Sequence, residues 1–239
     1  MDLGWFEIAL DVQDIGRSAA FYEALGFQRV AGEFDRGFLT LQSGDCRLSL
    51  LQGYLNPPQA QLIFWQGDPE AIWRELKARG VEFEKFNVLR DPDGQPLYFV
   101  NEAGVARRDP ATPSEPALGR FEAALNVQDI DRTQAFYETL GFRRVDDGRH
   151  APGIATLRQA DCRISLYRGH LDPPETQLIF WQGDIESIAR TLTSRGLSFE
   201  KGPTRFEGGG GSVALKDPDG HTIFLINMPG VVRGEPARA

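Results

Sequence analysis

The chain has 239 residues, of which 41% are hydrophobic and 25% are charged, so it can bury the core of one or two globular domains. Its formal net charge is −8 and its Lys and Arg residues are scattered, which argues against nucleic acid as a partner. No apolar run approaches the roughly 18 residues that cross a bilayer, and the first residues lack a secretory signal pattern. We therefore expect a cytoplasmic protein with no membrane partner.

The first predicted elements are a strand, a helix and three short strands. Apolar residues alternate with others from Phe6 to Val12, which is typical of a half-buried strand. Asp14 is a suitable N-cap for a helix that runs to Leu25 and ends at Gly26. Three short strands are then predicted at about residues 27–30, 38–42 and 46–51.

The same order of elements begins again at Gln61. QLIFWQ predicts a strand, and PEAIWRELKARG predicts a helix with Pro69 at its start and Gly80 at its end. VEFEKF, VLRD and PLYFVN predict three further strands. The first half of the chain is thus expected to contain two βαβββ modules.

The second half of the sequence repeats the first. LDVQDIGRSAAFYEALGFQRV from Leu10 recurs as LNVQDIDRTQAFYETLGFRRV from Leu125, and QLIFWQGD recurs unchanged. Between the copies, EAGVARRDPATPSEPALG is typical of an exposed linker. We predict a first domain at 1–104, a linker at 105–119 and a second domain at 120–239. Cys46 and Cys162 occupy matching strand positions, so we expect buried, reduced thiols rather than a disulfide.

These motifs carry a family resemblance. A first strand LxVxD, a helix ending in FYexLGF and a late DPDG turn resemble the vicinal oxygen chelate superfamily of glyoxalase I, extradiol dioxygenases and bleomycin-resistance proteins. The resemblance implies an α+β fold in which four βαβββ modules form two glyoxalase-like domains with cupped mixed sheets. Modules that pair within a half and modules that swap across halves both fit the sequence. The tandem chain would mimic the dimer of single-domain relatives, so we expect a monomer acting as a pseudo-dimer, with a homodimer as the alternative.

In that superfamily, metal ligands project from the concave face of the cup. The resemblance places them at Glu7, Ser49, Gln61 and Tyr98 in the first half and at Glu122, Ser165, Gln177 and Phe224 in the second. Only the Glu and Gln residues of these sets coordinate readily. We therefore expect no metal cofactor, with a divalent ion held by Glu7, Gln61, Glu122 and Gln177 as the alternative.

The three histidines lie away from the ligand positions. His150 falls in a loop and His221 follows the DPDG turn, and we expect both to be solvated. His170 is left open, because its loop leads into the Gln177 strand near the mouth of the cup.

Strand alternation predicts what faces the cup instead of a metal. Arg47 shares a side with Ser49, and Trp65 shares a side with Gln61, so an arginine would meet Glu7 in a partly dry cup and pair with it. The arginines could also hold an anionic or carbonyl group while the tryptophans stack on an apolar body; a structural salt bridge with aromatic packing is the alternative. The candidate ligand-binding residues are Arg47, Ser49, Gln61, Trp65, Tyr98, Arg163, Ser165, Gln177, Trp181, Phe224 and Phe206.

The catalytic residues are not identified from sequence. Glu7 and Glu122 are candidates for a general base if burial raises their pKa values, although a nearby arginine acts in the opposite direction. DPDG is interpreted as a turn without a catalytic role.

The second half carries about ten residues, around GGGG, that the first half lacks. We expect them to form a mobile loop bearing Arg205, Phe206 and Glu207 that closes over the second cup, so that only this cup retains ligand binding. The function that the sequence favours is metal-free binding of an apolar, partly anionic small molecule. The alternative is a divalent-metal-dependent glyoxalase-like lyase or isomerase that uses Glu7 or Glu122 with Gln177 or Gln61.

Overall fold

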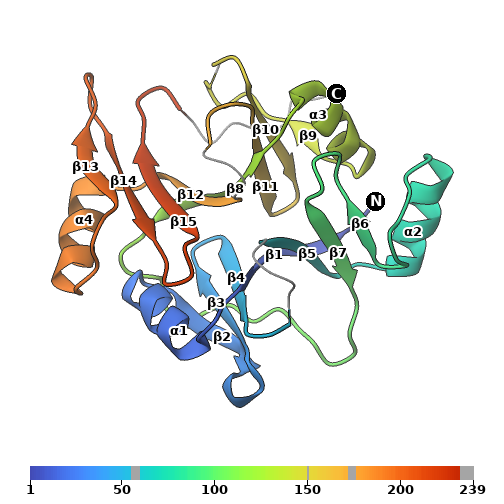
Figure 1. Cartoon of the computed structure of the whole chain (residues 1–239), viewed down its shortest axis with the longest axis horizontal. Helices are drawn as coiled ribbons and strands as arrows, with labels where there is room; N and C mark the ends of the chain where they lie inside the picture. The colour runs from blue at the N-terminus through green and yellow to red at the C-terminus, as the bar shows by residue number, and fades with distance from the viewer. Residues whose placement is uncertain (55–59, 150, 172–175, 232–239) are drawn as a thin grey trace.

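The computed structural model describes residues 1–54, 60–149, 151–171 and 176–231. The chain folds into two curved mixed sheets, one of seven strands and one of eight, with helices packed against them (Figure 1). This is the α+β fold with two glyoxalase-like domains that the sequence predicts. No helix in the described part of the chain is both long enough and apolar enough to cross a membrane.

Each half of the chain supplies the elements of one sheet. The first half forms β1 (Gly4–Asp11), α1 (Ile15–Ala24), β2 (Gln28–Glu33), β3 (Phe38–Ser43), β4 (Cys46–Leu51), β5 (Gln61–Gln66), α2 (Pro69–Ala78), β6 (Val88–Arg90) and β7 (Pro96–Val100). The second half forms β8 (Gly119–Asn126), α3 (Ile130–Thr139), β9 (Arg143–Arg144), β10 (Ile154–Gln159), β11 (Cys162–Tyr167), β12 (Gln177–Gln182), α4 (Ile185–Ser194), β13 (Lys201–Arg205), β14 (Gly211–Lys216) and β15 (Thr222–Asn227).

The two modules of each half pair with one another. In the first sheet, of order β2-β3-β4-β1-β5-β7-β6, β1 runs antiparallel to β5 with Phe6 opposite Phe64. In the second, of order β13-β14-β15-β12-β8-β11-β10-β9, β8 runs antiparallel to β12 with Phe121 opposite Phe180. The pairing that the sequence left open is therefore made within a half, and no module is swapped between the two sheets.

An aspartate precedes each of the four α-helices in the described residues. The side chain of the N-cap residue accepts a hydrogen bond from a backbone N–H of the first turn, which otherwise has no partner. A glycine with positive φ follows the last turn of each helix and releases the chain toward the next strand. The N-caps are Asp14, Asp68, Asp129 and Asp184, and the glycines are Gly26, Gly80, Gly141 and Gly196.

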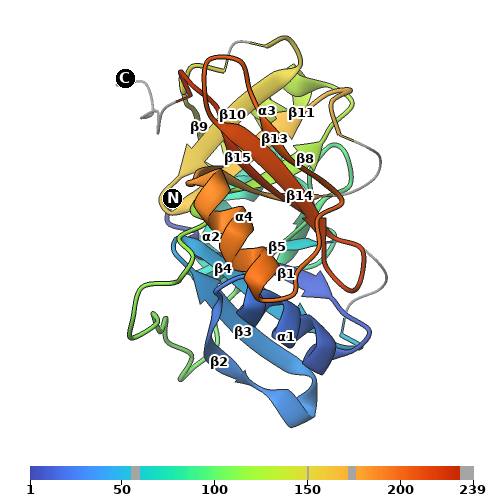
Figure 2. The ribbon, with the colours of Figure 1, turned by 90° about the vertical axis from the view of Figure 1, so that its left-hand side faces the viewer.

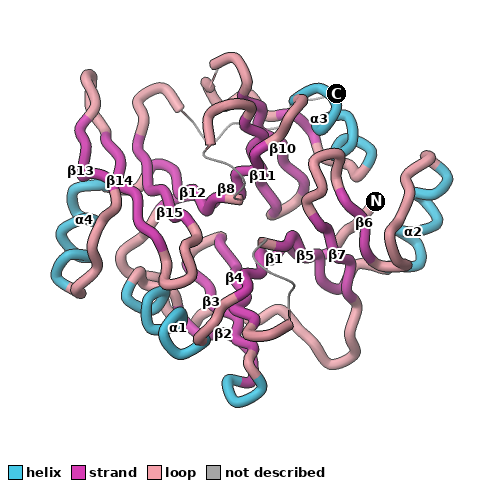
Figure 3. The backbone as a smooth tube through the Cα atoms, viewed as in Figure 1, coloured by secondary structure: helices cyan, strands magenta, loops and turns pink. Residues whose placement is uncertain are grey.

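The expected strand VEFEKF is not formed in the first half. Here the chain reverses between Lys85 and Val88, which exchange backbone hydrogen bonds of 3.1 and 3.2 Å, so only two residues separate them and β6 begins at once. In the second half the extra residues give room for a full hairpin, and the equivalent segment becomes β13, paired with β14 beside α4 (Figure 3). The prediction of three strands in the second module is wrong for the first half because the turn is too short.

One hydrophobic core joins the two halves. Side chains on the faces opposite Glu7 and Glu122 pack together, with the rings of Phe6 and Phe121 stacked 6.5 Å apart. Figure 2 shows β2 and β3 of the first half at the bottom and β10 and β11 of the second at the top. The core includes residues of both halves. Cys46 and Cys162 are buried in it as free thiols, as expected.

Each DPDG turn accepts hydrogen bonds from a helix of the other half. The Tyr137 hydroxyl of α3 donates to Asp91 Oδ2 at 3.1 Å, and the Tyr22 hydroxyl of α1 donates to Asp217 Oδ2 at 2.9 Å. The third residue of each turn repeats the pattern, because Asp93 accepts from Thr133 and Asp219 accepts from Ser18, both at 2.6 Å. The motif is a turn, as predicted, but its aspartates also fasten the two domains in a reciprocal arrangement that the sequence did not reveal.

His221 belongs to this contact and is not solvated. The residue is 6% exposed, and its Nδ1 lies 2.9 Å from Asp217 Oδ2. The first half has Gln95 at the matching place, so the two turns carry different chemistry. The expectation of a solvated His221 is wrong because the residue after the turn points back into the domain contact. His150 lies outside the described residues.

Asp91 and Asp217 should make the free energy of unfolding depend on pH in opposite directions. Burial raises the pKa of Asp91 to about 6, whereas the hydrogen bond and charge of His221 outweigh burial and lower the pKa of Asp217. The raised pKa means that folded Asp91 binds its proton more tightly than the unfolded chain does. Its contribution to stability is therefore present below about pH 4 and is lost as the pH rises to about 6.

We expect the free energy of unfolding of the wild type, relative to Asp91→Asn, to fall by about 2 kcal/mol between pH 4 and pH 6 in urea titrations. Asp217→Asn is the matched control. The contribution of Asp217 to stability is present above its pKa in the unfolded chain. It is lost as the pH falls through its lowered pKa in the folded protein. A difference between wild type and Asp91→Asn that rises with pH would contradict the assignment.

Candidate functional site

The concave faces carry the residues that the sequence placed there. In the first sheet, Ala9 lies opposite Gln61 on one side and opposite Ser49 on the other, and Glu7 lies opposite Ile63. Because opposite residues share a face, Glu7, Ser49 and Gln61 all point into the same cup. The register of β8, β11 and β12 repeats this arrangement in the second half.

Glu7 is the centre of the first cup. It is 3% exposed and accepts hydrogen bonds from Arg47 Nε at 3.3 Å, from Trp65 Nε1 at 3.2 Å and from the Ser49 hydroxyl. Burial raises the pKa of Glu7 even though Ser49 and Arg47 act against the rise. The predicted pairing of this glutamate with Arg47 is confirmed.

The segment after β7 covers the first cup. Arg47 Nη1 donates to the Arg108 carbonyl at 2.7 Å, and Gln42 Nε2 donates to Asp109 Oδ1 at 3.1 Å. Gln66 Nε2 fixes the start of the segment by donating to the Val105 carbonyl at 2.6 Å. Nε and Nη1 of Arg47 thus donate to the chain itself rather than into open space.

Glu122 holds the same central place in the second cup. It is fully buried and accepts from Arg163 Nε and from Trp181 Nε1, both at 3.2 Å, and from the Ser165 hydroxyl. The pairing with Arg163 is the one that the sequence predicted.

A second arginine enters this cup, and sequence reasoning missed it. Arg149 Nη1 and Nη2 donate to the two oxygens of Glu122 at 2.7 and 2.8 Å in a forked pair. Its guanidinium lies 4.5 Å from the centre of the Trp181 ring and also binds the buried Asp147. Burial alone would lower the pKa of Arg149, but Glu122 and Asp147 more than offset it and raise the pKa.

Arg149 enters because the halves diverge after the first helix. β2 continues through Glu33, whereas β9 stops at Arg144, and the following residues turn inward. The one signal in the sequence was the DDGR segment at 146–149, where the second half is one residue longer than the first between its phenylalanine and its next strand. The sequence of so short an irregular stretch does not indicate which of its side chains points into the domain.

A cavity of about 690 Å³ opens on the concave face of the second sheet. Among the predicted ligand-binding residues, Gln177, Trp181 and Phe224 line it, whereas Arg163 and Ser165 are not part of its wall and bond to Glu122. Polar residues that the sequence analysis did not assign to the ligand site also line it: Arg149, Tyr167, His170, Glu200, Lys201, Lys216 and Thr222. The sequence left the role of His170 undecided. The structure places it at the cavity, with Nε2 2.9 Å from the Pro152 carbonyl.

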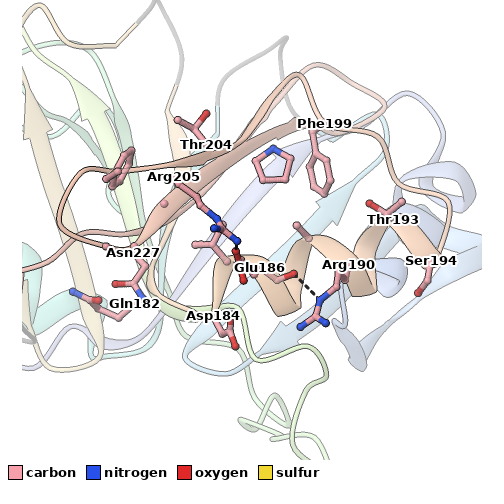
Figure 4. Close-up of a pocket in the computed structure, with 17 residues that line it drawn as sticks. Gln182, Asp184, Glu186, Arg190, Thr193, Ser194, Phe199, Thr204, Arg205 and Asn227 are labelled. Atoms are coloured by element: carbon pink, nitrogen blue, oxygen red, sulfur yellow. Dashed lines mark hydrogen bonds and ion pairs between the residues drawn. The ribbon is translucent and has the colours of Figure 1, made fainter.

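The extra residues of the second half do not form the expected mobile lid. They build the β13–β14 hairpin, which lengthens the sheet, and the hairpin turn lines a separate open groove against α4 (Figure 4). Arg205 of β13 pairs across this groove with Glu186 of α4, and Phe206 lines it. Phe206 also packs against the apolar cluster of the concave face, although it is not in the cavity wall.

The side chains at the inherited metal positions do not fit a divalent cation. The oxygens of Glu122 face two guanidinium groups, and those of Glu7 face Arg47, Ser49 and Trp65. Such cations need several oxygen or nitrogen ligands in one shell. Within the described ranges, no group of three or more His, Cys, Asp and Glu side chains could hold a metal ion.

Comparison with known proteins matches the second domain to a family model. Residues 119–225 match the family model described as Glyoxalase/Bleomycin resistance protein/Dioxygenase superfamily. No curated protein matches the sequence. The matched residues are the second domain, and the first domain repeats its sequence and strand order. The second domain therefore matches this superfamily, and the first domain is a copy of it in sequence and in fold.

Solved structures of dioxygenases share the fold. The 2,3-dioxygenase LapB from Pseudomonas sp. KL28 is 17% identical, over 97% of this chain and 92% of its own, with a TM-score of 0.64. A mutant of homoprotocatechuate 2,3-dioxygenase from Brevibacterium fuscum is 20% identical, over 99% and 74% of the two chains, with a TM-score of 0.65. A variant of the B. fuscum enzyme in complex with HPCA is 21% identical, over 95% and 72%, with a TM-score of 0.63. At these identities the likeness establishes the fold and not the reaction.

The two central glutamates should differ in their importance for stability. In Glu122→Gln, Arg149 and Arg163 both lose a buried counter-charge, so we expect a loss of about 3 kcal/mol or more in the free energy of unfolding. In Glu7→Gln, the amide still accepts a hydrogen bond while Arg47 keeps its other partners, so a loss of about 1 kcal/mol is expected. Urea denaturation at pH 7 measures both, and equal losses would contradict the difference between the two clusters.

Proposed function

We propose that the second domain binds a small, mostly apolar molecule with a partly anionic or carbonyl end in its concave cavity. The observation that carries the proposal is the cavity itself. Its volume of about 690 Å³ lies within the usual range for small-molecule sites, and apolar residues such as Ile179, Trp181, Phe224 and Ile226 dominate its wall. A few polar side chains in such a wall orient a ligand.

The two cups do not support binding equally. The first cup is covered by the segment at Arg108 and Asp109, which takes up donors of Arg47 and Gln42. The cavity wall of the second cup includes Tyr167, at the place where the first cup has Leu51. We therefore assign ligand binding to the second domain and a supporting role to the first.

The alternative of a metal-dependent lyase or isomerase draws support from the superfamily, whose printed description and solved relatives include dioxygenases. Against it stand the arginines on both candidate glutamates. A carboxylate held by buried guanidinium groups is a poor metal ligand and a poor general base, because both roles need an oxygen that is free to react. Binding without a metal is the better fit to these side chains.

The fold also supports the proposed assembly. Reciprocal contacts between the domains, such as Tyr22 with Asp217 and Tyr137 with Asp91, give one chain the pseudo-symmetry of a dimer. A monomer acting as a pseudo-dimer in the cytoplasm, without nucleic acid, is the setting in which we propose that the protein works.

Filling the cavity should weaken binding. Ala214 lines the cavity and lies opposite Phe224, so a tryptophan there occupies the space that the rings of a ligand need. We expect Ala214→Trp to weaken binding of 2-ethylnaphthalene, followed by its fluorescence, by about tenfold or more. Val88→Trp is the matched control, because Val88 lies opposite Tyr98 at the same place in the first sheet. Undiminished binding by Ala214→Trp, or loss in Val88→Trp alone, would exclude this cavity.

Metal removal should have no effect. Because guanidinium groups already neutralise Glu7 and Glu122, we expect protein purified without chelator to contain well under one metal ion per chain. Dialysis against EDTA should leave the melting temperature and 2-ethylnaphthalene binding unchanged. Stoichiometric Zn, Ni, Mn or Fe in elemental analysis, with a melting temperature that falls on chelation, would establish the metal-dependent alternative.

A further inference from the structure

Arg149 lines the cavity but has no hydrogen left for a ligand. A guanidinium carries five N–H groups. Nε donates to Asp147, Nη1 donates to Glu122 and to the Tyr167 hydroxyl, and Nη2 donates to Glu122, with Asp147 also in reach at 2.5 Å. Thr156 and Ser165 also compete for Nη2. The forked grip on a ligand that was predicted for an arginine in this cup is therefore not available from Arg149.

Tyr167 supplies what Arg149 lacks. Its hydroxyl oxygen accepts from Arg149 Nη1 at 3.0 Å, and in the described part of the chain its own hydrogen has no acceptor. The side chain is 6% exposed, and the residue forms part of the cavity wall. A buried hydroxyl with an unused hydrogen facing a cavity is an incomplete hydrogen-bonding group that a ligand atom can complete.

The surroundings of Tyr167 make it a persistent and strengthened donor. Burial, followed by the charge of Glu122, raises the pKa of Tyr167, so the hydroxyl keeps its proton at neutral pH. A cation that donates to the hydroxyl oxygen polarises the O–H bond, which strengthens the hydrogen bond that the same hydroxyl donates.

The charges of the second cup favour an electron-rich acceptor. Glu122 and Asp147 pair with Arg149 and Arg163, and Arg120 adds a further positive charge beside this cluster. The wall also carries Glu200, Lys201 and Lys216, whose charges sum to one further positive charge. Nε and Nη2 of Arg120 are buried and have no hydrogen-bond partner in the described structure. Burial, and then the neighbouring Arg163, lower the pKa of Arg120 to about 10, so it remains charged at neutral pH.

We propose that Tyr167, held in place by Arg149, is the hydrogen-bond donor that anchors a carboxylate or carbonyl oxygen of the ligand in the second cup. The inference rests on the proposed function of the cavity and adds to it the chemistry of the ligand's polar end. The apolar body of the ligand extends from Tyr167 along Trp181 toward Phe224. Arg149 is a positioning residue in this arrangement, because it acts on the ligand only through the Tyr167 hydroxyl.

The first cup shows which change created the donor. Tyr167 and Leu51 are the last residues of β11 and β4, and each lies opposite the last residue of the neighbouring first strand, Asn126 or Asp11. The first half therefore tolerates leucine at the place where the second half has tyrosine. This equivalence supplies a substitution that the fold already accommodates.

The test compares three probes of similar size in the full-length protein. 2-Naphthoate carries a carboxylate, 2-acetonaphthone carries a neutral carbonyl, and 2-ethylnaphthalene carries no acceptor. We expect Tyr167→Phe to weaken binding of whichever acceptor probes the wild type prefers by about tenfold while leaving 2-ethylnaphthalene within about twofold. Tyr54→Phe is the control, since its hydroxyl donates to the Arg36 carbonyl outside this cavity. If Tyr167→Phe does not fold, Tyr167→Leu replaces it.

The outcomes separate the two proposals. If the wild type binds none of the three probes, the proposed function fails. If it binds them and the preference for an acceptor is the same in wild type and variant, the cavity stands and the Tyr167 anchor is wrong. A wild-type preference for 2-naphthoate over 2-acetonaphthone, lost in the variant, assigns a carboxylate to the ligand. A wild-type preference for 2-acetonaphthone over 2-naphthoate, lost in the variant, assigns a neutral carbonyl to the ligand.

Discussion

A buried carboxylate at the centre of each cup is the constraint on which the site depends. A glutamate removed from water must be protonated, paired or coordinated to a cation, because an isolated buried charge is too costly. Glu7 and Glu122 are both almost inaccessible, and both use an arginine, a serine and a tryptophan of the neighbouring strands. The guanidinium thus provides the compensation that a metal ion gives in a chelating member of the fold.

The two cups then diverge in how completely that compensation is made. Glu7 has one arginine, and burial still raises its pKa. Glu122 has two arginines, and the second one, Arg149, brings Asp147 with it. Because Arg149 arrives from the irregular segment after β9, it also reaches Tyr167 and orders one wall of the cavity. The glutamate with two arginines therefore lies in the cup where the described residues form a cavity.

The sequence predicted those parts of the structure that follow from periodicity and repetition. Alternation on β1 and β4 was sufficient to place Glu7, Arg47 and Ser49 on one face, because the side-chain period of a strand is fixed at two. It was insufficient for Arg149, because an irregular segment has no period and its direction is set by tertiary contacts. It was also insufficient for the β13–β14 hairpin, because β13, KGPTR, has no alternation of apolar residues. The prediction of a strand at 81–86 failed because a short turn outweighs the apolar pattern of this segment.

His221 and the DPDG turns show a further limit of local reasoning. The local pattern of a turn is satisfied by the backbone alone, so nothing in it indicates that Asp91 and Asp217 also accept from tyrosines more than 40 residues away. These contacts lie on the far side of the sheets from the cups, where Phe6 and Phe121 stack. The faces opposite the glutamates are buried in the contact between domains, so only the concave faces are available to a ligand. Of these, the second carries both the open cavity and a hydroxyl whose hydrogen is still unused.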